Sequence, residues 1–357
     1  MTTVPPVSGL DASQPLALRR ALSAYVSAVA EICPAVPRGV LDIWTLGPVD
    51  SLAISELLTS LQRPVAVFDV GTFVGGSAFA FACHPAVTHV ISIDPNPLIA
   101  DEINDKREML QTSVDPDDDS NLRVQDVAAR ALSRFPDVAA RIELRRGHLG
   151  APSDLPSTED TEAVPLPPAE GDGAQLVVFV DGGHSADAVH ADLRAAFSQR
   201  PDALAVLDDC RYAWGPFVQA GVARFLDEHS GEEGGYRFHL LTDLVPALGR
   251  ANLGVVYPAG DDRVEESLQV FARRFSGRMD LLRLLEREDE LVHLQSDTFG
   301  RLQAALELAQ RLSEERDELA GQLEQMAEAA GLAHERVLDL EQSTSWRLTA
   351  PLRRLHG

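Results

Sequence analysis

The chain has 357 residues, of which 45% are hydrophobic, and its 55 acidic against 31 basic residues give a formal net charge of −24. This length predicts one large domain with an appendage, or two domains. The acidic balance counts against a nucleic-acid partner, because contact with a polyanion needs clustered Lys and Arg side chains.

The N-terminus, the hydropathy and the cysteines together predict a cytoplasmic protein. The N-terminus lacks the basic start and apolar stretch of a secretory signal, and no run of about eighteen apolar residues occurs. Cys33, Cys83 and Cys210 lack CxxC spacing, so neither a disulfide framework nor a zinc site is expected.

Helices and strands are expected to alternate after the first 60 residues. Two helices come first, Leu16–Ile32 and Val49–Leu61, the second with Asp50 or Ser51 placed to cap it. Short apolar runs without polar alternation then indicate a parallel sheet buried on both faces. The predicted strands are Val65–Val70, His89–Ile93, Ile142–Leu144, Leu176–Val180 and Ala203–Leu207, with Tyr236–Leu241 and Leu253–Tyr257 as a hairpin-like pair at one edge.

Two inserts and a change of composition complete this pattern. Asp115–Ser120 is an acidic turn, and Gly150–Gly173 is interpreted as an exposed loop or a lid over a site. After Pro258 the sequence is rich in Leu, Glu, Arg, Ala and Gln. Apolar residues from Leu302 to Leu340 follow three- and four-residue steps, which predicts a coiled coil or helical hairpin and hence a homo-oligomer. The alternative is one amphipathic helix folded back on the domain.

The predicted fold class is α/β, a doubly wound, Rossmann-like, mostly parallel sheet with N-terminal helices and a C-terminal long helix or coiled coil. Four segments are expected: an N-terminal helical segment (1–48), the α/β domain (49–260), the helical extension (261–342) and a basic tail (343–357).

A glycine-rich turn follows the first predicted strand. It reads FDVGTFVGGS, in which Gly71 permits a tight turn, and Gly75 and Gly76 let the next helix begin close to the sheet. The backbone N–H groups of such a loop suit a polar or anionic ligand. The spacing is GxxxGG rather than the GxGxxG of NAD sites, and a tight turn without a ligand is the alternative interpretation.

Asp94, in HVISIDPNP, ends the next strand. A carboxylate at this place can accept both hydroxyls of an adenosine ribose. NAD and S-adenosylmethionine both carry that ribose, so Asp94 does not separate the two cofactors. An Asp before Pro also commonly forms a turn.

Two later strands also end in acidic residues. LVVFVDGGH ends in Asp181 and His184, and ALAVLDDC ends in Asp208 and Asp209. Parallel strands line one crevice with their carboxyl ends, and three carboxylates there repel one another unless they are protonated or hold a cation such as Mg²⁺. The cation could lower the pKa of a substrate hydroxyl, and His184 could take the proton. Alternatively, the Asp side chains only cap a helix and His184 only hydrogen-bonds a loop.

These four motifs, in this order, resemble the class I S-adenosylmethionine-dependent methyltransferases. They are most similar to the branch of macrocin-type and other sugar O-methyltransferases and the related cephalosporin-hydroxylase-like proteins. The resemblance covers roughly Val49 to Pro258 and rests on FDVGTFVGGSAFAFA, ISIDP, FVDGGHSADAVHADL and VLDDCRYAWGPFVQAGVARFL.

The resemblance implies a site for S-adenosylmethionine and, in metal-dependent members, for a divalent cation. The residues around the methionine part of the cofactor would be Asp69, Gly71, Gly75, Gly76 and Ser77, and Asp94 would bind the ribose. The cation ligands would be Asp181, Asp208 and Asp209.

The chain departs from the family pattern at two places. Some members carry a catalytic base two residues after the first cation ligand, where this chain has Gly183, so the base role would pass to His184. Members often carry an acidic residue after the third strand to contact adenine, and RRGHLG, Arg145 to Gly150, has none.

The basic tail carries a second resemblance. STSWRLTAPLRRL, Ser343 to Leu355, looks like a terminal segment found after coiled coils in bacterial glycosyltransferases and methyltransferases of surface-polysaccharide assembly. Its basic residues with Trp346 could contact an anionic inner membrane face or a glycosyltransferase. A helix end with ordinary surface arginines is the alternative.

The sequence therefore predicts an S-adenosylmethionine-dependent O-methyltransferase, metal-assisted, acting on a sugar hydroxyl of a surface glycan or a glycosylated metabolite. A NAD-dependent oxidoreductase on the same fold is one alternative. An inactive scaffold that recruits polysaccharide enzymes is another, although three adjacent carboxylates carry a desolvation cost that a scaffold has no use for.

Overall fold

The structure, a computed structural model, describes residues 15–34, 41, 46–99, 101, 122–150, 162–168, 173–211, 214–230, 235–246 and 251–277, with single positions 283, 284, 287, 316, 321, 322, 326, 332 and 336. The chain divides into two units, Met1–Phe299 and Gly300–Gly357. The predicted acidic turn, most of the Gly150–Gly173 insert and the basic tail lie outside the described residues. The predicted coiled coil is described at only six positions, all helical, so it stays a prediction.

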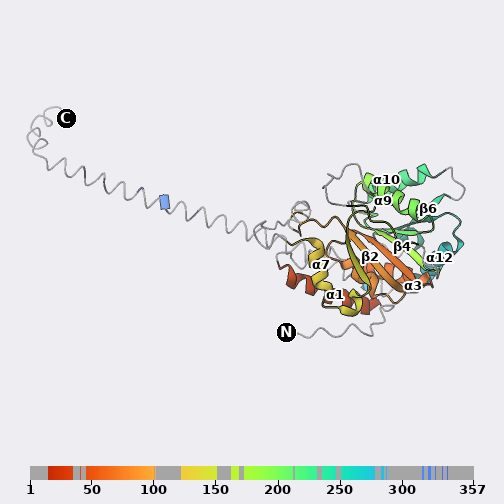
Figure 1. Ribbon diagram of the computed structural model, residues 1–357, viewed down its shortest axis with the longest axis horizontal. Helices are drawn as coiled ribbons and strands as arrows, with labels where there is room; N and C mark the ends of the chain where they lie inside the picture. Colours follow the sequence, from red (N-terminus) through yellow and green to blue (C-terminus); the bar gives the residue numbers. More distant parts are fainter. Residues whose placement is uncertain are drawn as a thin grey trace, which may run out of the picture. The chain divides into compact units, whose positions relative to one another are not determined.

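A mixed seven-stranded sheet, in the order β3-β2-β1-β4-β5-β7-β6, lies at the centre of the first unit (Figure 1). The strands are β1 (Val65–Val70), β2 (Val87–Asp94), β3 (Ile142–Arg146), β4 (Gln175–Val180), β5 (Leu204–Leu207), β6 (Tyr236–Leu240) and β7 (Gly254–Pro258). Strands β1 to β5 pair in parallel, and β7 runs antiparallel between β5 and β6. The predicted fold class is confirmed, and every observed strand overlaps a predicted one with ends that differ by at most two residues.

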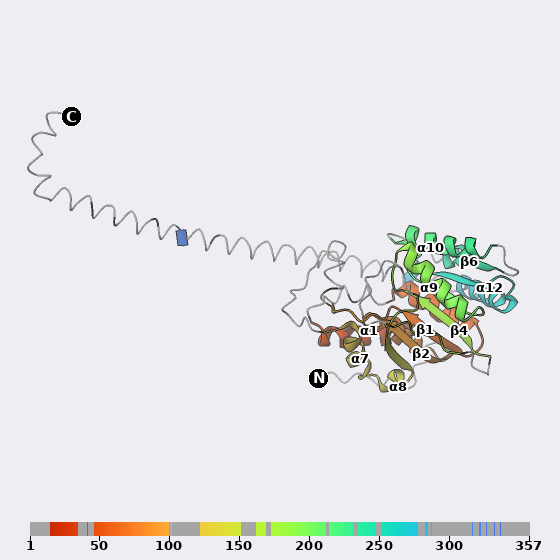
Figure 2. The same cartoon turned by 45° about the horizontal axis from the view of Figure 1, so that its top comes forward.

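Helices cover both faces of the sheet, and Figure 2 shows α9 and α10 together on one of them. The helices are α1 (Pro15–Ile32), α3 (Pro48–Ser60), α4 (Gly76–Cys83), α7 (Val124–Leu132), α8 (Pro136–Ala139), α9 (Ala186–Gln199), α10 (Gly215–Glu228), α11 (Leu241–Leu244) and α12 (Asp262–Ser276). Along β1 the side chains alternate: Val65 and Val67 enter the core under α1, α3, α4 and α12, while Phe68 and Val70 enter the core under α9 and α10.

Two helices outside the predicted α/β segment pack onto it. On α1, the Tyr25 ring stacks on Phe79 of α4 with centroids 4.4 Å apart. On α12, Phe271 is fully buried, and Arg274 pairs with the buried Glu56 of α3 at 2.6 Å. Among the described residues, no helix is long and apolar enough to cross a membrane.

The predicted N-cap of α3 is wrong. Gly47 occupies the cap position, and Pro48 begins the helix, where its missing N–H costs nothing because no acceptor exists for it. Ser51 instead donates its hydroxyl to the carbonyl of Gly47, and Asp50 accepts the backbone N–H of Asn252 at 2.8 Å. Asp50 is thereby tied to the strand ends described next.

Candidate active site

The carboxyl ends of the parallel strands form two clusters that meet between β1 and β4. The strand order reverses there, and in open α/β sheets ligands bind at such a switch point. We call the glycine loop with Asp69 and Asp94 the β1–β2 cluster. Asp181, His184, Asp208 and Asp209 form the β4–β5 cluster.

The glycine loop is held by contacts that exclude larger residues. Gly71 has φ +104°, and a Cβ there would lie 2.2 Å from the carbonyl oxygen of Asp181. Gly75 has φ +82°, and a Cβ there would lie 2.6 Å from the hydroxyl of Tyr25, which itself donates to the carbonyl of Val74 at 2.6 Å. The loop can therefore approach a ligand with its backbone, and it touches the end of β4.

Asp69 is fully buried beneath this loop. Its Oδ2 accepts hydroxyls from Ser92 at 2.6 Å and Ser77 at 3.1 Å. Its Oδ1 is buried without a hydrogen-bond partner among the described residues. Burial raises the pKa of Asp69 to about 7, against the hydroxyl hydrogen bonds that lower it. An orphaned acceptor at the base of a glycine loop is one that a cationic ligand group would satisfy.

Asp94 lies beside the same loop, where the sequence predicts it. One of its oxygens accepts the N–H of Phe73 at 3.0 Å and the other that of Asn96 at 2.6 Å. An ionised carboxylate offers about four acceptor sites, so further hydroxyls can be accepted. The side chain of Asn96 in turn accepts the N–H of Gln125 at the start of α7.

The β4–β5 cluster brings three possible metal ligands together. One ligand atom each from Asp181, His184 and Asp209 lies within 4.8 Å of the other two. His184 Nδ1 is 3.2 Å from Asp209 Oδ2. Two carboxylates and an imidazole can hold a divalent cation, and the His–Asp contact can equally orient a base.

Asp208 and Asp209 differ in ways the sequence does not show. Val180 and Leu207 are paired in register, so Asp181 and Asp208, one residue further on, are neighbours on the same face. Burial, then the nearby charges of Asp181, Asp50 and Asp209, raises the pKa of Asp208 well above its ordinary value. Asp209 has φ +53°, a left-handed conformation that turns it toward His184.

Asn252, which the sequence did not single out, fastens the end of β5. Its side-chain amide donates to Asp209 Oδ1 at 2.7 Å and its side-chain oxygen accepts the N–H of Arg211 at 2.7 Å. Its backbone N–H donates to Asp50 at 2.8 Å, and its carbonyl accepts the N–H of Cys210 at 2.8 Å. These four bonds hold Asp209 with one oxygen facing His184.

Trp214 was also missed, although it stands in the motif that carries the family resemblance. Its indole stacks on the His184 ring with centroids 5.3 Å apart and an angle of 25° between the planes. It is the N-cap residue of α10 and stands five residues after Asp209, the last residue of the cluster in sequence. An exposed aromatic beside buried motifs gives no sequence signal of its own.

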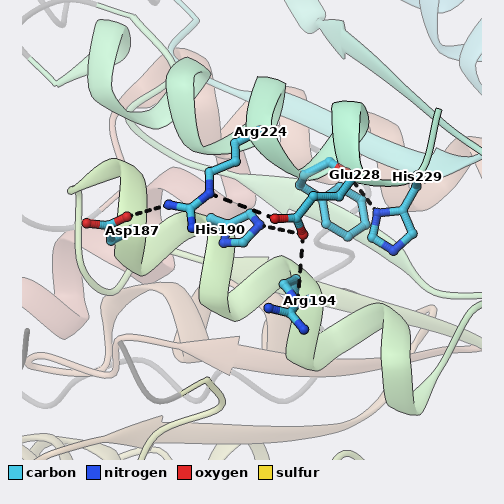
Figure 3. A network of polar contacts seen from close by, with 7 residues as sticks. Asp187, His190, Arg194, Arg224, Glu228 and His229 are labelled. Carbon is cyan, nitrogen blue, oxygen red and sulfur yellow. Dashed lines mark hydrogen bonds and ion pairs between the residues drawn. The ribbon is translucent and has the colours of Figure 1, made fainter. Parts of the chain in front are cut away.

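Ion pairs join α9 and α10, the two helices that follow the loops of the β4–β5 cluster (Figure 3). Arg224 pairs with Asp187 at 2.6 Å, and the buried His190 pairs with Glu228 at 2.9 Å. The helices approach closely because a Cβ at Gly221 would lie 2.7 Å from a backbone oxygen of α9.

The segment after β3, where the family pattern expects an adenine contact, folds back on the domain. Gly147 donates its N–H to the carbonyl of Asp94 at 3.0 Å, and Gly150 donates to Asp192 Oδ1 at 3.0 Å. Burial raises the pKa of Asp192 to about 7. Gly183, in the position of the expected base, is exposed and offers no side chain.

No known protein family matches the sequence, and no curated protein matches it. Several solved structures resemble the chain, including the following three. The O-methyltransferase TomG from Streptomyces achromogenes, in complex with SAM, is 21% identical over 67% of this chain and 90% of its own, with a TM-score of 0.36. A putative O-methyltransferase from Klebsiella pneumoniae is 17% identical over 73% of this chain and 93% of its own, with a TM-score of 0.37. Cofactor-bound Rv0187 from MTB is 18% identical over 66% of this chain and 88% of its own, with a TM-score of 0.38. Likeness at this level assigns no function to the chain.

Proposed function

We propose that the chain is an S-adenosylmethionine-dependent O-methyltransferase that acts on a sugar hydroxyl with the help of a divalent cation. The observation that carries the proposal is the junction of the two clusters at Gly71 and Asp181. A loop and carboxylate suited to a nucleoside lie on one side, and a cation-type group of Asp181, His184 and Asp209 lies on the other.

The β1–β2 cluster fits the cofactor. Asp94 would accept the ribose hydroxyls, and the unsatisfied Oδ1 of Asp69 would receive the positive charge of the methionine part. Gly71, Gly75, Gly76 and Ser77 would line the loop around it. When bound, the cofactor supplies an electrophilic methyl group.

The β4–β5 cluster would prepare the acceptor. Asp181 and Asp209, with Asp208 beside them, would hold a divalent cation such as Mg²⁺, which lowers the pKa of a hydroxyl bound to it. His184 would take the proton: an Nδ1 that donates to Asp209 leaves Nε2 as the basic nitrogen. Methyl transfer is a displacement at carbon, so the remaining task is to align the hydroxyl.

Calorimetry with S-adenosylmethionine on the full chain tests the proposal. We expect binding to the wild type and at least about tenfold weaker binding to Asp94→Ala, because hydrogen bonds to a charged group are lost. Asp126→Asn, an exposed carboxylate on α7, is the matched control and should bind as the wild type does. A wild type that does not bind the cofactor would end the proposal.

A NAD-dependent oxidoreductase is the second candidate, since Asp94 would serve it equally. The GxxxGG spacing and the antiparallel β7 beside β5 both depart from a dinucleotide-binding fold with GxGxxG and a parallel sixth strand. Titration followed by NADH fluorescence separates the two candidates. Cofactor binding without any cation binding would instead favour the inactive scaffold.

A further inference from the structure

Two aromatic side chains beside the β4–β5 cluster are exposed. Trp214 is 38% exposed and Phe217 is 54% exposed. Within the described residues from 15 to 277 they are the only exposed large hydrophobic side chains; the others, Leu284, Met326 and Leu332, come later in the chain. The centroids of the two rings lie 6.5 Å apart. Adjacent exposed aromatics on an otherwise well-covered domain mark a binding surface.

This pair of aromatics is continuous with the residues proposed to act on the acceptor. The Trp214 indole stacks on the His184 ring, which contacts Asp209. A molecule that covers the outer part of the indole therefore lies next to the proposed base and cation ligands. The neighbourhood suits the acceptor rather than a distant partner.

The backbone beneath the pair is held by hydrogen bonds and close packing. Gly215 donates its N–H to the carbonyl of Arg211 at 3.1 Å, and a Cβ at Gly215 would lie 2.8 Å from the carbonyl oxygen of Cys210. Phe217 donates its N–H to the carbonyl of Trp214 at 2.9 Å. A surface that is already ordered binds a ring with little further loss of conformational entropy.

The charges around the pair select against anions. Asp181 and Asp208 follow paired strands in register, and Asn252 hydrogen-bonds both Asp50 and Asp209, so four carboxylates lie together at these strand ends. One bound divalent cation would not make the net charge of these four carboxylates positive. An acceptor with a phosphate or carboxylate near the reacting hydroxyl would be repelled, whereas a neutral one would not.

We propose that Trp214 and Phe217 form the acceptor-binding surface, and that the acceptor is a neutral sugar whose ring stacks on the Trp214 indole. One face of a pyranose presents C–H groups with a small positive charge, which pack on the negative face of an aromatic ring. The hydroxyl at the ring edge then reaches the β4–β5 cluster. The inference rests on the proposed function and names the acceptor of the same site.

Saturation-transfer NMR on the full chain, with S-adenosylhomocysteine present, tests this inference. The probes are the methyl glycosides of rhamnose, fucose, glucose, galactose and mannose, with catechol and glucose 1-phosphate as the flat aromatic and the anionic probe. We expect transfer to the ring C–H protons of at least one neutral glycoside. The affinity should fall about three- to tenfold in Trp214→Ala and be largely retained in Trp214→Phe. Leu284→Ala, which removes an exposed side chain elsewhere, is the matched control.

The outcomes separate this inference from the proposed function. The same variants are titrated with S-adenosylmethionine by calorimetry, and Trp214→Ala should bind it as the wild type does. The inference is overturned if no neutral glycoside receives saturation, if the transfer is unchanged in Trp214→Ala, or if only catechol or glucose 1-phosphate binds. Cofactor binding by the wild type would in each of these cases leave the proposed function standing.

Discussion

The two clusters at the strand ends solve the problem of buried carboxylates differently. In the β1–β2 cluster the chain itself supplies most of the donors: Asp94 accepts two backbone amides, and one oxygen of Asp69 accepts two hydroxyls while its Oδ1 has no partner among the described residues. In the β4–β5 cluster Asp181 and Asp208 are neighbours at the ends of paired strands, and burial, followed by the nearby charges of Asp181, Asp50 and Asp209, raises the pKa of Asp208.

The β1–β2 cluster is thus largely preformed, whereas the β4–β5 cluster needs a bound proton or cation to relieve its repulsion. Hydrogen bonds within the chain hold Asp94 and one oxygen of Asp69 before any ligand binds. The β4–β5 cluster carries repulsion that a proton or a cation relieves. The two clusters should therefore respond to different changes, and the following variants test that contrast.

The largest effect is expected from Asp209→Ala. It removes a proposed ligand and the partner of both His184 and Asn252, so Mn²⁺ affinity should fall more than about 100-fold, beyond what loss of a supporting residue causes. Electron paramagnetic resonance of added Mn²⁺ gives the affinity, and calorimetry should show S-adenosylmethionine binding within about twofold of the wild type.

Two further variants, Asp187→Asn and His184→Gln, are needed to interpret the result for Asp209→Ala. Asp187→Asn, an exposed carboxylate paired with Arg224, should leave Mn²⁺ binding unchanged. His184→Gln should also retain it if His184 is a base, and a loss as large as that of Asp209→Ala would make His184 a ligand instead. Equal loss of cation and cofactor binding in Asp209→Ala would contradict the separation of the clusters.

A crossed pair of asparagine variants gives the next largest effect. Asn252→Ala should weaken Mn²⁺ binding about 10- to 100-fold, because it frees the Asp209 carboxylate. Asn96→Ala should weaken S-adenosylmethionine binding instead, because it loosens the contact between the Asp94 turn and α7. Both ligands are measured on both variants. If either variant weakens both ligands equally, the clusters are not independent.

Asp69 gives a pH-dependent effect on stability. Its pKa is raised from 3.8 to about 7 by burial, so the stability that its protonated form contributes is fully present below pH 3.8 and is lost as pH rises toward 7. Between pH 5.5 and 6.5 this loss is at most about 1.4 kcal/mol. Urea unfolding at the two pH values should show a smaller fall in Asp69→Asn.

Asp192 serves as the comparison for that experiment, because burial raises its pKa to about 7 as well, outside both clusters. Asp192→Asn should reduce the fall by a similar amount, and the double variant should reduce it by the sum, since the two side chains share no partner. An unchanged pH dependence in Asp69→Asn would mean that Asp69 is ionised throughout this range.

The smallest effect is expected from the ion pairs of α9 and α10. Arg224→Ala removes exposed contacts to Asp187 and Glu228, so the free energy of unfolding should fall by less than about 1 kcal/mol. Urea unfolding at low and high salt should show the difference shrink as salt rises. A fall above about 2 kcal/mol would show that these pairs, rather than the strand ends, hold the β4–β5 loops.

Most of the sheet could be predicted from the sequence because short apolar runs such as Val65–Val70 directly indicate buried strands. The same logic located Asp94 and Asp181, since the carboxyl end of a predicted strand is a definite place. The residues it missed act across long separations: Asn252 bonds Asp50 across 202 positions, and Tyr25 reaches the glycine loop from α1. No local pattern marks such contacts.

The paired Asp208 and Asp209 show a subtler limit. In the sequence, Asp208 and Asp209 are two adjacent Asp residues that nothing distinguishes, and the family resemblance implies that both are cation ligands. Strand alternation places Asp208 beside Asp181, and only the left-handed backbone at Asp209 turns the second carboxylate to His184. A backbone angle of this kind at a non-glycine residue is not written in the sequence.

The contact between Gly71 and the carbonyl of Asp181 also bears on how this domain tolerates change. Any side chain at position 71 would push against the backbone of Asp181, the first proposed cation ligand. A substitution at this position of the cofactor loop would therefore also disturb the β4–β5 cluster. Phe217, by contrast, is more than half exposed, whereas Trp214 stacks on the His184 ring. New acceptor preferences can thus be sought at the rim while the position between the clusters stays glycine.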